Sequence, residues 1–95
     1  MSAYIVADVE VTDAAAYEEY RKHVPDIITA YGGRYLVRGG ACEILEGSWQ
    51  PKRSVILEFA TMAALKRFWE SPEYRPFRVL RERAAKSHLV AIEGL

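Results

Sequence analysis

The sequence has few of the residues that metal, disulfide and nucleophilic sites require. Its 95 residues include one cysteine, Cys42, and two histidines, His23 and His88. A single cysteine excludes an intrachain disulfide and a cysteine-rich zinc site. The histidines stand far apart and belong to no metal-binding motif, so we expect no metal. Neither a glycine-rich phosphate loop nor a Gly-x-Ser-x-Gly nucleophile motif is present.

Net charge and long hydrophobic runs are absent as well. Lysine and arginine together number 13, aspartate and glutamate also 13, and the formal net charge is +0. Nucleic-acid-binding domains are usually basic, so we expect no nucleic-acid partner. No apolar run approaches the ~18 residues of a membrane span. The first residues lack the basic start and apolar stretch of a signal peptide. We therefore expect a cytoplasmic protein with no membrane contact.

The composition that is present describes a packed globular protein. Hydrophobic residues make up 51% of the chain and aromatic residues 12%, which excludes a disordered chain. The length allows one core, so we predict a single domain over residues 1–95. A domain this small is marginally stable, and a homodimer would bury more apolar surface per chain.

The first half of the sequence predicts a strand, a helix and a hairpin. Alternating apolar residues indicate a strand over 3–11, and helical spacing indicates a helix over 14–31 with its N-cap at Thr12-Asp13. Pro25 predicts a kink or break in that helix, which Gly32-Gly33 ends. Residues 34–46 read as a strand bent at Gly39-Gly40, followed by a turn over 47–51 and a strand over 53–60.

The second half predicts two helical segments and a closing strand. Thr61 caps a helix over 62–70, and Ser71-Pro72-Glu73 starts another that runs to about Lys86. Residues 87–93 form the last strand. The order β-α-β-β-α-β is the ferredoxin-like, split βαβ pattern, an α+β fold with helices on one face of an antiparallel sheet. The other face carries apolar side chains, so we expect a partner to cover it.

The ordered motifs of the chain resemble those of a small bacterial family, number thirteen-thirty among the domains of unknown function. The resemblance spans the whole chain and rests on Asp13, Tyr31-Gly32-Gly33-Arg34, Arg38-Gly39-Gly40, Glu46-Gly47 with Trp49, Glu58-Phe59, Trp69, Ser71-Pro72-Glu73-Tyr74, Arg81 and Glu93-Gly94. It implies a dimeric α+β barrel, in which the sheet packs against that of a second copy. The wider superfamily includes cofactor-independent monooxygenases of polycyclic quinols, haem-degrading oxygenases and isomerases, but the family itself has no established reaction.

Three charged residues stand within otherwise apolar strands: Asp8, Arg38 and Glu58. Counting back from a turn near Trp49 places Arg38 opposite Glu58 or Phe59, so we predict an Arg38–Glu58 pair on a covered face. The pair is either a structural ion pair or a pocket charge that orients an anionic or phenolic ligand.

Four further residues are candidates for the site. Trp69 and Tyr74 flank the break between helices at Pro72. Their side chains either fill the hydrophobic core or line a cleft between the helices and the sheet. Arg81 lies near the apolar side of its helix and can hold a carboxylate of the protein or of a ligand. His23 lies at the edge of the apolar stripe of the helix over 14–31. It is either a half-exposed residue beside that stripe or a catalytic base.

These residues support three functional hypotheses. The first is a cofactor-independent monooxygenase or isomerase acting on a small hydrophobic or aromatic acid. In it, Trp69, Tyr74 and Arg81 bind the substrate, Arg38 stabilises an oxyanion, and His23 or Glu58 moves a proton. The second is a non-catalytic small-molecule binding module. The third is a structural or interaction dimer without a pocket. We expect no cofactor in any of the three cases.

Overall fold

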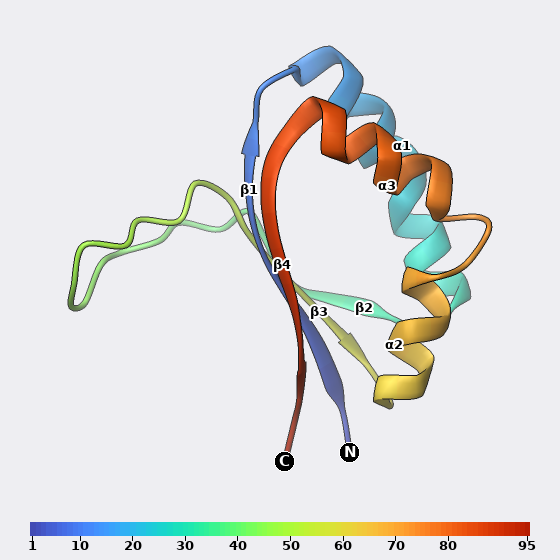
Figure 1. The fold of residues 1–95 in the computed structure, drawn as a ribbon. Helices are drawn as coiled ribbons and strands as arrows, with labels where there is room; N and C mark the ends of the chain where they lie inside the picture. Colours follow the sequence, from blue (N-terminus) through green and yellow to red (C-terminus); the bar gives the residue numbers. More distant parts are fainter.

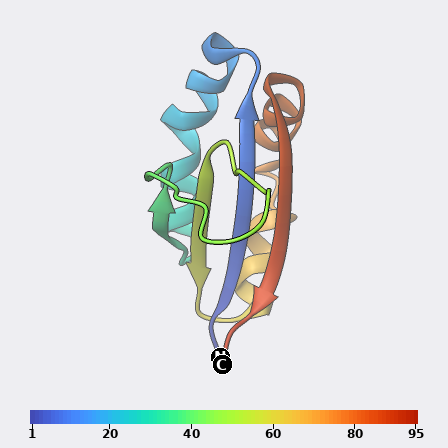
Figure 2. The ribbon, with the colours of Figure 1, turned by 90° about the vertical axis from the view of Figure 1, so that its left-hand side faces the viewer.

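The computed structural model describes all residues, 1–95, and contains four strands and three helices. In chain order they are β1 (Ala3–Val11), α1 (Ala14–Ala30), β2 (Arg34–Arg38), β3 (Ser54–Phe59), α2 (Met62–Trp69), α3 (Arg75–Ala84) and β4 (Ala85–Glu93). The strands form one antiparallel sheet in the order β2-β3-β1-β4. This is the predicted α+β, ferredoxin-like arrangement. All three helices lie on one side of the sheet, and the two termini lie side by side at one end (Figures 1 and 2).

The core lies between the sheet and the helices. Alternate residues of β1 and β3 point toward the helices, because side chains of a strand alternate between its faces. The largest fully buried side chains are Tyr74, Phe59, Phe68, Ile28 and Val24. Aromatic rings join the layers: the Phe68 ring lies 4.4 Å from that of Tyr74 and 5.4 Å from that of Phe59, centroid to centroid.

Helix α1 begins where predicted but is not broken. The Asp13 side chain accepts a hydrogen bond from the Ala16 amide at 3.1 Å, as an N-cap does. The predicted break at Pro25 does not occur, since the helix continues to Ala30. Val24 and Ile28, on either side of the proline, are 1% and 2% exposed. Their packing stabilises the helix through the position where proline removes a backbone hydrogen bond.

The junction between α2 and α3 is a capped turn. Thr61 caps α2 by accepting from the Ala64 amide at 3.0 Å. Ser71 is buried, donates to the Phe68 carbonyl at 2.8 Å and accepts from the Tyr74 amide at 3.2 Å. The regular helix starts at Arg75, later than Ser71-Pro72-Glu73, where its start was predicted, because these residues form the capped turn. Strand β4 begins at Ala85, directly after α3 and earlier than the predicted residue 87.

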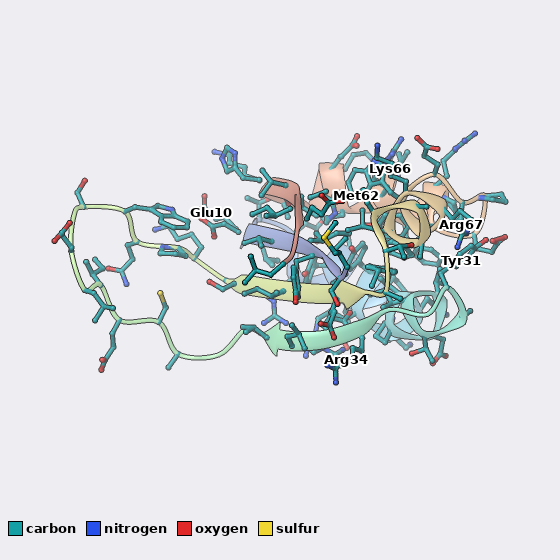
Figure 3. All side chains as sticks on the ribbon, turned by 90° about the horizontal axis from the view of Figure 1, so that it is seen from below. Glu10, Tyr31, Arg34, Met62, Lys66 and Arg67 are labelled. Atoms are coloured by element: carbon teal, nitrogen blue, oxygen red, sulfur yellow. The ribbon has the colours of Figure 1, made fainter.

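The segment between β2 and β3 differs most from the prediction. Pairing of β2 ends at Arg38, because Gly39 adopts a φ of +72° with the Arg53 guanidinium packed against it. Residues 39–53 are a long loop that projects from the side opposite the helices (Figures 1 and 3). Asp8 anchors its end, accepting from the amides of Lys52 at 2.8 Å and Arg53 at 3.3 Å.

The second face of the sheet has no helix over it. Val90 and Ile92 of β4 are 54% and 49% exposed there. They lie opposite Val6 and Tyr4 of β1, whose side chains are on the same face. No helix of the structure has the length and apolar character needed to cross a membrane.

Candidate functional site

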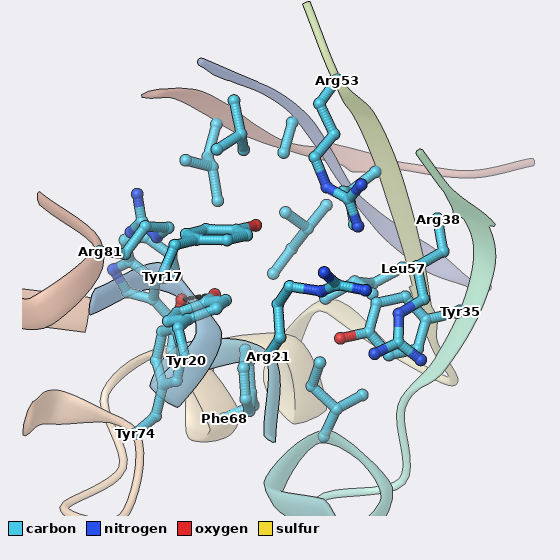
Figure 4. Close-up of a pocket in the computed structure, with 17 residues that line it drawn as sticks. Tyr17, Tyr20, Arg21, Tyr35, Arg38, Arg53, Leu57, Phe68, Tyr74 and Arg81 are labelled. Carbon is cyan, nitrogen blue, oxygen red and sulfur yellow. Dashed lines mark hydrogen bonds between the residues drawn. The ribbon is translucent and has the colours of Figure 1, made fainter. Parts of the chain in front are cut away.

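A cavity lies between the helix-covered face of the sheet and α1, α2 and α3 (Figure 4). Its free space is about 40 Å³, and 13 of its 17 lining residues are hydrophobic. Apolar side chains of β1, β3 and β4 form its floor. The polar groups of the lining are of two kinds: four tyrosines (Tyr17, Tyr20, Tyr35 and Tyr74) and four arginines (Arg21, Arg38, Arg53 and Arg81).

An irregularity in β2 brings two of these polar side chains to the cavity. Tyr35 pairs with Leu57, and Arg38 pairs with Val55, although the regular alternation would put positions 35 and 38 on opposite faces. The register shifts between Tyr35 and Val37, as at a β-bulge, so both side chains point to the helix side. The Arg38 guanidinium lies 4.7 Å from the centre of the Tyr35 ring.

The tyrosines of α1 form a stack that ends on Tyr74. The rings of Tyr17 and Tyr20 are stacked with centroids 5.3 Å apart, and the Tyr20 and Tyr74 hydroxyls are 2.7 Å apart. Burial, followed by the neighbouring Tyr74, raises the pKa of Tyr20 well above its usual value. Burial also raises the pKa of Tyr35, against the opposing effect of Arg38. Both phenols are therefore neutral near pH 7 and are available as hydrogen-bond donors, not as bases.

Arg81 places a positive charge inside the cavity wall without a counter-ion. It is 4% exposed, takes part in none of the ion pairs, and its Nε has no hydrogen-bond partner. The groups near its guanidinium are the hydroxyls of Tyr74 and Tyr20 and the Trp69 ring, whose centroid is 5.8 Å away. A guanidinium stays charged in proteins, and a buried charge without an opposite partner is costly. The arrangement therefore favours an anion in this cavity.

The mouth of the cavity carries three more guanidinium groups. Arg21 comes from α1, Arg38 from β2 and Arg53 from the end of the long loop, and their side chains converge in Figure 4. Of these three arginines, only Arg21 forms an ion pair. Its partner is Glu18 of the same helix, at 3.4 Å. Neither a carboxylate nor an imidazole belongs to the lining. The lining therefore favours negative charge in the cavity and offers no carboxylate or imidazole as a base.

Four of the six residues predicted for the site lie together in this lining: Arg38, Trp69, Tyr74 and Arg81. His23 does not join them. It is exposed on α1, with its Nε2 3.5 Å from Glu19 and its ring 5.4 Å from that of Phe77. Glu58 does not join them either, because it lies on the uncovered face of the sheet.

The predicted Arg38–Glu58 pair does not form. Glu58 pairs with Arg34, whose Nε and Nη2 both lie 2.7 Å from the same carboxylate oxygen. The prediction assumed a short turn near Trp49, whereas the loop over residues 39–53 shifts the register so that Arg38 lies opposite Val55. Arg38 and Glu58 consequently point to opposite faces of the sheet.

The remaining polar lining residues were not predicted from the sequence. Tyr17, Tyr20 and Arg21 stand three and four residues apart on α1, and this helical spacing was the signal that all three share one side of the helix. Tyr35 lies in β2, two residues after Gly33, but its position beside Arg38 depends on the bulge. No sequence pattern marked Arg53 as a lining residue, because the path of the long loop brings its side chain to the cavity. No group of three metal-binding side chains lies together in the structure.

Comparison with solved structures shows the same architecture in proteins of low sequence identity. A protein of unknown function from Rhodopseudomonas palustris is 21% identical, with a TM-score of 0.77 over 99% of this chain and 82% of that one. SnoaB, a cofactor-independent oxygenase from Streptomyces nogalater, is 12% identical, with a TM-score of 0.66 over 99% and 93%. A dimeric ferredoxin-like protein of unknown function from Jannaschia is 14% identical, with a TM-score of 0.67 over 99% and 100%.

These likenesses identify the fold as that of the ferredoxin-like, dimeric α+β barrel proteins. Among curated proteins, none matches the sequence. The family model of a domain of unknown function, DUF1330, matches residues 2–95. The match covers nearly the whole chain, and it confirms the resemblance seen in the ordered motifs. The chain belongs to the DUF1330 family.

Proposed function

We propose that the protein binds a small aromatic or hydrophobic acid in its ionised form and acts on it as a cofactor-independent monooxygenase. The observation that carries the proposal is Arg81, a buried guanidinium without a carboxylate partner in the wall of an apolar cavity. An anionic ligand supplies the missing counter-charge, and in a site shielded from water that interaction is strong. SnoaB, which has this fold, is a cofactor-independent oxygenase, and that chemistry fits a cavity of this polarity.

The proposed reaction uses the ligand as its own source of electrons. The substrate loses a proton from an acidic C–H or O–H group, and Arg81 and Arg38 stabilise the resulting anion. The anion transfers electrons to molecular oxygen, one oxygen atom is retained as a carbonyl, and the other leaves as water. A CH₂ group thus becomes C=O while O₂ supplies both oxygen atoms, so no further reductant is required.

The other lining residues orient the ligand. Trp69 and Tyr74 pack against its ring, with their own rings 5.8 Å apart. Tyr20 and Tyr35, whose raised pKa values keep them protonated, donate hydrogen bonds to the developing oxyanion. His23 and Glu58 lie outside the lining, and the geometry gives no support to their role in proton transfer. In the proposed mechanism the proton leaves to solvent at the arginine-lined mouth.

Binding of the ionised form is tested with para-nitrophenol, whose phenolate absorbs visible light. We expect the protein to lower the apparent pKa of the bound phenol by about one unit, which corresponds to ~1.4 kcal/mol of preference for the anion. Arg81→Met should abolish the shift. Arg78→Met is the matched control, since Arg78 lies on the same helix with its guanidinium 5.0 Å from the Trp69 ring but does not line the cavity. An unshifted pKa in the unmodified protein contradicts the proposal.

Turnover is tested with beta-tetralone, an aryl-fused ketone with an acidic methylene group. We expect oxygen uptake above the uncatalysed background and a product that has gained one oxygen and lost two hydrogens. Arg38→Ala and Trp69→Ala should reduce the rate while the protein remains folded. Anion binding without oxygen uptake would favour the second candidate function, a non-catalytic binding module, which the absence of a carboxylate or imidazole from the lining also fits. Absence of both would favour a structural dimer.

We also propose that the uncovered face of the sheet is the interface of a homodimer. Val90 and Ile92 are about half exposed on that face, and the fold is shared with a dimeric protein from Jannaschia. Burying such side chains against a second copy would contribute roughly 25 cal/mol per Å² of apolar surface. Analytical ultracentrifugation should give twice the chain mass for the unmodified protein and the chain mass for Val90→Glu. A monomer at micromolar concentration contradicts this assembly.

A further inference from the structure

A second hollow adjoins the cavity on the side of α2. It is a groove of about 350 Å³ between α2 and the free edge strand β4, and six of its eight lining residues are hydrophobic. The two charged residues of the lining, Lys66 and Glu70, stand on α2 and carry opposite signs. The groove therefore has an apolar floor and no net charge, which suits an uncharged hydrocarbon group.

The groove and the cavity share three walls. Ile5, Trp69 and Leu89 line both, so these side chains are what separates the two spaces. Trp69 is the last residue of α2, and its indole is half-buried between the helices and the sheet. Its ring also lies 5.8 Å from the Arg81 guanidinium. A group that passes Trp69 from the groove therefore arrives at the buried charge.

The volumes favour a ligand that uses both spaces. The cavity, with about 40 Å³ of free space, has room for a few water molecules. Small-molecule sites are typically ~300–1,000 Å³. The cavity alone is therefore smaller than a typical ligand site, and the adjoining groove supplies further volume.

We propose that the ligand is an acid with an extended apolar tail, bound with its acidic group at Arg81 and its tail past Trp69 in the groove between α2 and β4. This inference rests on the proposed function, because it assigns the acid to the same cavity, and it adds the second subsite and the shape of the ligand. Two features carry it: the buried guanidinium without a carboxylate partner at one end and the uncharged, apolar groove at the other.

The test compares benzoate with para-pentylbenzoate by isothermal titration calorimetry. Both acids place one carboxylate at Arg81, but the pentyl chain also reaches the groove. We expect the tail to strengthen binding to the unmodified protein by about tenfold or more, since each buried CH₂ contributes roughly 0.8 kcal/mol at most. Arg81→Met should weaken both acids.

A filled groove provides the specific control. Ala91 lies on β4, lines the groove and does not line the cavity, so Ala91→Phe should remove the gain from the pentyl chain while leaving benzoate unchanged. The matched control is Ala63→Phe, an equal change at an exposed position of α2 outside both spaces. It should alter neither affinity.

The outcomes separate this inference from the proposed function. If benzoate binds with dependence on Arg81 but the pentyl chain adds nothing, or adds as much in Ala91→Phe as in the unmodified protein, the groove is not a subsite and the proposed function stands. A groove covered by a second copy of the chain would give that result. If neither acid binds, both proposals fail.

Discussion

Arg34 and Glu58 are directly paired across β2 and β3, and two nitrogens of the guanidinium fork lie 2.7 Å from one carboxylate oxygen. The pair lies at the edge of the sheet, where Arg34 is exposed (Figure 3). The hydrogen bond from Arg34 lowers the pKa of Glu58, with smaller contributions from Tyr4 and Ser2. The pair joins β3 to the start of β2, the strand that carries Tyr35 and Arg38 to the cavity.

The lowered pKa predicts an acid-dependent loss of stability. A carboxyl group with a lower pKa in the folded state stabilises the fold above its unfolded pKa, about 4.3, and this contribution disappears as pH falls through the folded value. Urea unfolding at a series of pH values should therefore show a steeper decline below about pH 5 for the unmodified protein than for Glu58→Gln. Glu43→Gln, in the exposed loop, should retain the steep decline. Parallel curves for Glu58→Gln and the unmodified protein would show that the pair does not matter.

We expect any larger residue at position 33 to lower the stability of the protein. A Cβ at this position would lie 2.6 Å from Cε1 of Phe59, a fully buried ring, and 2.9 Å from Cγ2 of Ile28. Gly33→Ala should therefore destabilise the protein by about 1–3 kcal/mol, the usual cost of overpacking a core. Gly40→Ala is the control, because nothing lies within 4 Å of its Cβ and its φ is not in the left-handed region. Denaturant unfolding of both variants checks the prediction, and equal stabilities would contradict it.

Local signals were sufficient for most elements of the fold. Caps at Asp13 and Thr61 and the glycine pair after α1 are short-range features, and each marks a boundary that the structure retains. The alternation of apolar residues over 3–11 indicated strand β1, which the structure retains. The break predicted at Pro25 does not form, because the tertiary packing of Val24 and Ile28 outweighs the local helix-breaking preference of proline.

The site was harder to predict because it depends on strand register. The Arg38–Glu58 prediction needed the loop length and the position of the bulge, and neither follows from residue types alone. A shift of one residue moves a side chain to the other face of a sheet, so Arg38 reaches the cavity through the bulge and not through simple alternation. Trp69, Tyr74 and Arg81 were found more easily, since helical spacing and the Pro72 turn place them on one side of the chain.

The hydroxyl pair of Tyr20 and Tyr74 should behave as one unit. Removing either hydroxyl leaves the other, 2.7 Å away in the half-buried wall, without its partner. Tyr20→Phe and Tyr74→Phe should each cost about 0.5–1.5 kcal/mol of unfolding free energy. The double variant should lose less than the sum of the two, because no unpaired hydroxyl remains. Additive losses in the double-mutant cycle would mean that the hydroxyls contribute independently, for example through Arg81.

The last prediction separates a ligand-binding role of Arg81 from a structural one. A buried charge that lacks a carboxylate partner costs desolvation free energy, and a methionine of similar length removes that cost. Arg81→Met should therefore leave the unfolding free energy of the ligand-free protein unchanged or raise it by about 1 kcal/mol, while anion binding is lost. Thermal unfolding without ligand provides the measurement, with Arg78→Met as the variant of equal charge change. A large loss of stability in Arg81→Met alone would mean that the guanidinium holds the tyrosines and Trp69 together. Unchanged stability with lost binding is the pattern expected of a residue kept for its ligand, because function then retains a charge that folding does not require.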